Sequence, residues 1–258
     1  MRGNRVYVLI LAALVLASAV TAFVIRASIP HFAFTQDSVA DFTMYWGGLD
    51  LTKLDELPTS QGLIESAELI AVVTPTGNRE LKNDRVLSEF VVSSVLLSNG
   101  KASAGDTIYI YESVHVNTYE GNPSVSLMSG TLNLMQEGAQ YLVLLRFFDQ
   151  TERYDYTEKD LVTYKFVSES FAAYPWGEYR YLYLPEDGSV APPAYRDARQ
   201  YTNIFGDERV RELYEALMAE MLSYAAQREI AGARQAAGEV SDTIRVNAGD
   251  VPYSGGRP

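Results

Sequence analysis

The sequence predicts a mainly β domain, a small antiparallel barrel or sandwich, between an N-terminal membrane helix and a C-terminal amphipathic helix. Short apolar runs rich in β-branched residues recur between residues 68 and 184, with Gly, Pro and Asn between them. An uncharged apolar run occupies residues 6–25, and apolar residues recur at helical spacing between Asp207 and Ile230. The 18 Tyr residues also favour strands.

Residues 6–25 predict a transmembrane anchor. A helix of about 20 residues spans about 30 Å, the hydrocarbon thickness of a bilayer. Arg2 and Arg5 precede the run and only Arg26 follows it closely, which predicts a cytoplasmic N-terminus and an outer C-terminal domain. The alternative is a signal peptide that is cleaved at residues 17–19 or within the small residues up to Ala22, which would release a secreted protein.

The rest of the chain divides by composition. We predict an anchor (1–27), a stalk or wrapping segment (28–58), a barrel domain (59–205), a C-terminal helix (206–231) and a disordered tail (232–258). The second segment mixes isolated apolar residues with Pro and Gly and has no sustained period, whereas the tail is polar and rich in glycine.

The barrel domain is predicted to open with a short helix over 59–67, capped by Ser60. Strands are predicted at 68–74, 86–97, 107–114, 140–148, 163–167 and 179–184, with a turn at 76–78 after the first of them. The run at 140–148 is the most apolar and is expected to be central. The expected core residues are Leu69, Ile70, Val72, Phe90, Val92, Leu142 and Leu144.

The C-terminal helix is predicted to begin near Asp207 and to stop at Gly232. Its apolar side runs from Val210 to Ala225 and needs a cover, because a lone helix of about 20 residues is marginal in water. We expect it to dock on the barrel. The alternative is a free helix that binds a partner or the membrane surface.

Charge and composition exclude several functions. The chain carries 33 acidic and 21 basic residues, a net charge of −12, so a phosphate backbone would be repelled and nucleic acid is not an expected partner. It has no cysteine, which excludes disulfides, thiol catalysis and Cys-ligated zinc.

Several short motifs resemble exported bacterial domains related to the OB-like barrel of netrin and tissue-inhibitor-of-metalloproteinase modules. They are the first strand in residues 66–73, a long strand that ends at Gly100, the pair Gly105–Asp106, and the run 137–142 before the core strand. The resemblance covers roughly residues 60 to 185 and implies a five-stranded OB-like barrel. The inhibitors chelate zinc through an N-terminal cysteine, which this chain lacks, so that mechanism does not transfer.

Motifs for catalysis are weak. The pattern Ser98–Lys101 matches S-x-x-K but falls in a turn, where that chemistry does not work. His31 and His115 have no ligand at the close spacing of metal sites, and the acidic residues from Asp149 to Asp160 lack the order of a calcium loop. No catalytic residue, metal site or cofactor is therefore predicted.

The densest aromatic stretch holds the candidate binding residues. Tyr174, Trp176, Tyr179 and Tyr181 could stack on a sugar or hold an extended peptide if exposed, and would close the barrel if buried. The sequence thus predicts a membrane-tethered extracytoplasmic domain, not an enzyme, that binds a protein or cell-envelope ligand. The alternative is an envelope hydrolase or metal-dependent enzyme, which a pocket with converging acids or His115 would favour.

Overall fold

The computed structural model describes residues 11–21, 34–49, 51–53, 57–82, 84–98, 100–118, 125–148, 155–185 and 187–247. Residues 11–21 are helical and belong to a unit separate from the domain that begins at Phe34. No helix in these ranges combines the length and the apolar character needed to cross a membrane. The other residues of the predicted anchor, 6–10 and 22–25, lie outside the described residues, as does His31.

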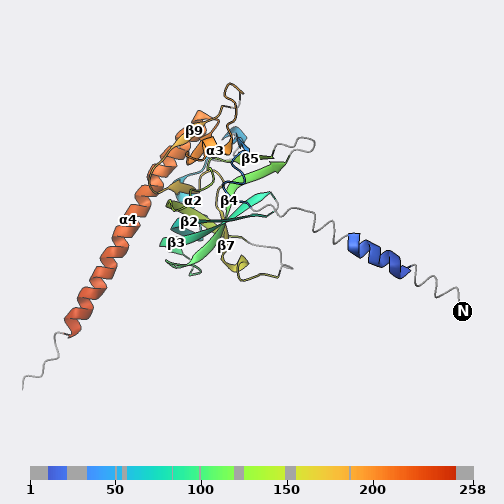
Figure 1. Ribbon diagram of the computed structural model, residues 1–258. Helices are drawn as coiled ribbons and strands as arrows, with labels where there is room; N and C mark the ends of the chain where they lie inside the picture. Colours follow the sequence, from blue (N-terminus) through green and yellow to red (C-terminus); the bar gives the residue numbers. More distant parts are fainter. Residues whose placement is uncertain are drawn as a thin grey trace, which may run out of the picture. The chain divides into compact units, whose positions relative to one another are not determined.

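Five strands close into a barrel, which confirms the predicted mainly β barrel (Figure 1). The order β4-β3-β2-β6-β7 returns to β4 through a parallel pairing of β4 with β7, and the other neighbours are antiparallel. The strands are β2 (Leu69–Lys82), β3 (Arg85–Ser98), β4 (Thr107–Thr118), β6 (Tyr141–Phe147) and β7 (Thr163–Phe166). β8 (Ala173–Pro175) adds to β6.

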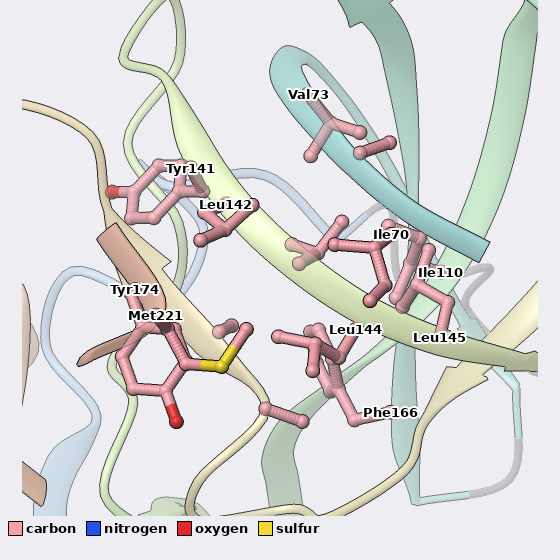
Figure 2. Packing of buried hydrophobic residues seen from close by; sticks show 14 of the residues in the cluster. Ile70, Val73, Ile110, Tyr141, Leu142, Leu144, Leu145, Phe166, Tyr174 and Met221 are labelled. Carbon is pink, nitrogen blue, oxygen red and sulfur yellow. The ribbon is translucent and has the colours of Figure 1, made fainter. Parts of the chain in front are cut away.

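The barrel core forms where the most apolar runs pair. Residues 69–73 of β2 and 141–145 of β6 are buried without interruption, as expected of strands covered on both faces. Ile70 lies opposite Leu144 in this pairing, and Ile110 packs in the same cluster (Figure 2). All seven predicted core residues are buried, so the predicted barrel core is confirmed.

The predicted turn at 76–78 is wrong, because β2 continues through it. The pairing with β3 shifts register between Pro75 and Arg79 and then runs on to Lys82. Gly77 has a positive φ of 89° at this irregularity, and a side chain there would collide with Glu137. The glycine therefore marks a bulge, and the chain reverses between Lys82 and Arg85.

β4 pairs with β3 along one edge, from Thr107 to His115, and with two different strands in succession along its other edge. On that second edge, Tyr109–Tyr111 pairs with β7, and Val114–Thr118 pairs with β5 (Val125–Ser129). We call the two residues between these pairings, Glu112 and Ser113, the fork.

Beyond the fork, a smaller second layer covers the domain. β1 (Thr43–Trp46) adds to β5 in parallel, so the described part of the predicted stalk or wrapping segment wraps the domain. A second hydrophobic cluster forms there, apart from the barrel cluster. It contains Phe34, Val39, Met44, Val86, Val114, Val116, Leu127, Leu134, Leu184, Tyr195, Ala198 and Ile204.

The remaining short elements connect these layers. The predicted strand at 179–184 is outside the barrel: β9 (Tyr181–Tyr183) pairs in parallel with β10 (Asn203–Phe205) in a separate sheet. α2 spans Ser60–Glu65 and is capped by Thr59, not by the predicted Ser60, since Thr59 Oγ1 accepts from Gly62 N at 3.1 Å. The others are η1 (Leu51–Lys53), η2 (Asp160–Val162) and α3 (Tyr195–Ala198).

The C-terminal helix α4 spans Glu208–Asn247 and docks on the barrel, as expected. Val210, Tyr214, Leu217, Met221 and Ala225 are all buried in the barrel cluster, and Tyr214 Oη donates to the Ala173 carbonyl at 2.8 Å. The helix continues past Gly232, so the predicted stop was too early; residues 248–258 lie outside the described residues.

We predict that truncation after Gly206 lowers the free energy of unfolding by about 5 kcal/mol or more, because five buried side chains of α4 leave the core. Truncation after Gly232 should leave that free energy unchanged. Urea unfolding of both truncated chains beside the full chain measures the difference. Equal stability of the two truncations would show that α4 does not belong to the fold.

Candidate functional site

A cleft of about 730 Å³ opens beside the fork. Three parts of the domain line it: β4 with Ser113, His115 and Val116; the end of β5 with Met128–Gly130; and residues 168–171, which follow β7. Gly47–Leu49, Pro58 and Asp84 complete the lining. The cleft thus lies where β5 and β7, the successive partners of β4, separate. We call it the fork cleft.

An imidazole between two carboxylates forms the polar side of the fork cleft. His115 Nδ1 lies 3.5 Å from Asp84 Oδ2, and His115 Nε2 lies 4.0 Å from Glu169 Oε2. Arg85 Nη1 donates to Glu169 Oε1 at 2.9 Å. Both carboxylates are more than half exposed, so these pairs contribute at most about 1 kcal/mol each to stability. Their groups therefore stay available to a ligand.

Ser113 supplies a buried polar atom to the same cleft. Its side chain is 4% exposed, and its hydroxyl has no hydrogen-bond partner among the described residues. Leaving such a group unpaired costs about 1–3 kcal/mol, which a bound ligand can offset with one hydrogen bond. Ser113 and His115 are two residues apart on β4 and share a strand face. The hydroxyl does not bond the imidazole, as an activated serine would.

The other fork residue, Glu112, is sealed inside the domain with Arg79. Both side chains are 1% exposed, and Arg79 Nε donates to Glu112 Oε1 at 2.9 Å. The same oxygen accepts from Ser88 Oγ, and Glu112 Oε2 accepts from the Met135 backbone N at 2.7 Å. Arg79 Nη2 donates to the Met135 carbonyl. This pair therefore fixes the wall behind the cleft and does not meet a ligand.

Burial and charge act against each other at Arg79. Burial lowers its pKa, but the charge and hydrogen bond of Glu112 raise it by more, so the pKa ends above its ordinary value and the guanidinium stays charged. Tyr141 and Tyr195 lie in the field of this pair, and burial raises the pKa of each to about 12. Both phenols are neutral at physiological pH.

The four aromatic candidates have mainly packing contacts. Tyr174 is fully buried and its ring lies 5.3 Å from that of Tyr214 on α4. Tyr179 is half-buried and donates to Glu215 Oε1 at 3.2 Å. Trp176 is half-buried and lines a separate cleft of about 460 Å³, while Tyr181 is 41% exposed. Trp176 and Tyr181 therefore keep surface for a ligand, whereas Tyr174 belongs to the core.

The other weak motifs have local roles. Ser98 Oγ accepts from Gly100 N at 2.9 Å within its turn. Asp160 is buried and accepts from Thr157 Oγ1 at 2.6 Å, while Asp149 and Glu152 lie outside the described residues. Within the described part of the chain, no group of His, Asp and Glu has the arrangement to hold a metal ion.

Most of the fork cleft has no signal in the sequence. The neighbours of His115, Asp84 and Glu169, lie 31 and 54 positions away along the chain, too far for a spacing motif. Glu112 did carry a signal, since it places a carboxylate directly after the alternating apolar strand residues 108–111. A charge at that position predicts either a buried partner or a site.

Comparison with protein-family models gives no match to this chain, and comparison with curated proteins gives none either.

We predict that Tyr195→Phe makes the free energy of unfolding fall less steeply as the pH rises above 10. The pKa of Tyr195 is raised to about 12 in the fold from an ordinary 10.0, so its contribution is complete below pH 10 and is lost between pH 10 and 12. Removing this one proton should make the fall in unfolding free energy shallower by up to about 1.4 kcal/mol per pH unit. Urea unfolding from pH 9 to 12 measures both slopes, and equal slopes would contradict the assignment.

Proposed function

We propose that this protein is a membrane-tethered extracytoplasmic binding domain that holds a protein or cell-envelope ligand in the fork cleft without transforming it. The observation that carries the proposal is the buried, unpartnered hydroxyl of Ser113 in a cleft of about 730 Å³. Clefts of this size, with an apolar wall and a few convergent polar groups, are typical ligand sites.

The lining indicates the chemistry of the ligand. Asp84 and Glu169 place negative charge at the polar side, and Ser113 offers a hydroxyl deeper in. Val116, Met128 and Phe171 supply apolar surface. A ligand with a cationic or hydrogen-bond-donating group on an apolar body fits this set, and a polypeptide segment with a basic side chain has both features.

The barrel is proposed to be OB-like. Numbered by their order in the chain, its strands follow the order 1-2-3-5-4-1, and the third and fifth strands form the one parallel pair. A five-stranded Greek-key barrel of this kind commonly presents a ligand surface. This order supports the resemblance to netrin and tissue-inhibitor-of-metalloproteinase modules.

The proposal of a membrane tether is supported by the uncharged run 6–25 and by the arginines that precede it. N-terminal sequencing of the protein extracted from membranes tests it, and a mature start between Ala19 and Ser28 would contradict a retained anchor.

A second candidate function, an envelope hydrolase, is favoured by one observation: His115 stands between two carboxylates beside a serine hydroxyl. The missing hydrogen bond between Ser113 and His115 weighs against it, because a serine nucleophile needs a base within reach.

We predict that Ser113→Leu strongly weakens ligand capture, because the larger apolar side chain intrudes into the fork cleft and removes its buried hydroxyl. The full chain in neutral detergent serves as bait for solubilised envelope material. Ser103→Leu, in an exposed loop away from the cleft lining, is the matched control. Material retained by the wild type and by the control should fall at least tenfold with Ser113→Leu.

Equal capture by all three chains would contradict the cleft as the binding site. Fragmentation of the retained material by the wild type, lost in His115→Gln, would replace the binding function with the hydrolase.

A further inference from the structure

A second cleft, rich in cationic side chains, adjoins the fork cleft. Its volume is about 520 Å³, and Asp84 and Glu169 line both clefts. Its other polar lining is basic, with Lys82, Arg85, Arg146 and Lys165. We call these four residues and the space between them the cationic cleft. With four cations and two carboxylates, its charged lining has a net charge of +2, in a chain whose net charge is −12.

Two of these cations lie opposite each other, and neither has a neutralising partner among the residues that the structure describes. Arg146 on β6 and Lys165 on β7 are directly opposite in the register of the sheet. Neither forms an ion pair with a carboxylate in the described part of the chain. Like charges directly opposite on a sheet are destabilising. In a chain with an excess of acids, this uncompensated pair indicates a place for an external anion.

The other two cations are only partly neutralised. Arg85 pairs with Glu169 at 2.9 Å, and both side chains are substantially exposed. Lys82 lies 3.4 Å from Glu80 Oε1, an oxygen that also binds Lys159 at 2.7 Å. Exposed pairs of this kind are weak, so an anion with several charged oxygens can compete for both donors.

Aromatic rings complete the wall of the cationic cleft. The rings of Tyr111 and Phe148 lie 4.7 Å apart, and Lys165 Nζ lies 5.3 Å from the centre of the Phe148 ring. Both rings line the cleft. The cation–π contact with Phe148 holds the Lys165 ammonium group against this apolar wall, where its interaction with an anion is stronger than in bulk water.

We propose that the cationic cleft binds an oxyanion of the phosphate class. Arg146 and Lys165 are its main donors, and Arg85 and Lys82 complete its shell. A free phosphorylated molecule and the headgroup of an anionic lipid both carry this chemistry. Asp84 and Glu169 line both clefts, but the proposal for the cationic cleft does not rest on the proposed function of the fork cleft.

Calorimetric titration of the full chain in neutral detergent tests the proposal with two probes, pyrophosphate and glycerophosphoglycerol, the deacylated headgroup of phosphatidylglycerol. Saturable binding of at least one probe is expected, with sodium chloride at matched ionic strength as the blank. Arg146→Gln and Lys165→Gln should each weaken it at least tenfold, because each removes a charge-assisted hydrogen bond. Preference for one probe identifies the source of the anion.

Three controls separate binding from folding and from the fork cleft. Arg180→Gln changes an exposed arginine outside the cationic cleft and should leave the affinity unchanged. Without anion, Arg146→Gln should melt no lower than the wild type, because it relieves the like-charge pair. Ser113→Leu should keep full anion affinity. Absence of saturable binding by either probe, or equal affinities of wild type and Arg146→Gln, would overturn the proposal.

Discussion

Arg79 and Glu112 form a salt bridge with both side chains 1% exposed, at the position where β4 exchanges β7 for β5 as its partner. Removing two charges from water costs several kcal/mol per ion, and here hydrogen bonds from Ser88 and from the backbone of Met135 help to offset that cost. These contacts connect β2, β3 and β4 with the chain before β6. The pair therefore holds three barrel strands together at the position where the edge of β4 passes from β7 to β5.

The fork creates the clefts because two ladders separate there. The edge of β4 leaves a space between its two successive partners. Ser113 of the fork and His115, two residues further along β4, line the fork cleft at this place. The chain after β7 forms the opposite wall, so its Glu169 reaches both this cleft and the cationic cleft. Within the fork, Glu112 and its ion pair with Arg79 hold β4 in place, while Ser113 and the other residues that line the fork cleft stay open to ligands.

The sequence was informative where local pattern decides the structure. The apolar runs of β2 and β6 predicted the barrel core, and the helical spacing of apolar residues in α4 predicted the docked helix. Each of these segments carries enough apolar side chains in a regular pattern to show that it is buried. β1 and β5 are short and mix polar with apolar residues, and they become strands only through each other and β4. Gly77 resembled a turn because bulges and turns both use a positive φ. Arg79 and Glu112 are 33 positions apart, and only the folded register brings them together.

A double-mutant cycle with Arg79→Met and Glu112→Leu tests the role of this ion pair most directly. Each single variant leaves a buried charge without its partner and should lower the free energy of unfolding by about 3–5 kcal/mol. The double variant should be far less destabilised than the sum, with a coupling energy of about 3 kcal/mol or more in urea unfolding at pH 7. Single effects that add to within about 0.5 kcal/mol would show that Arg79 and Glu112 do not act as a unit, and would contradict the account of the fork.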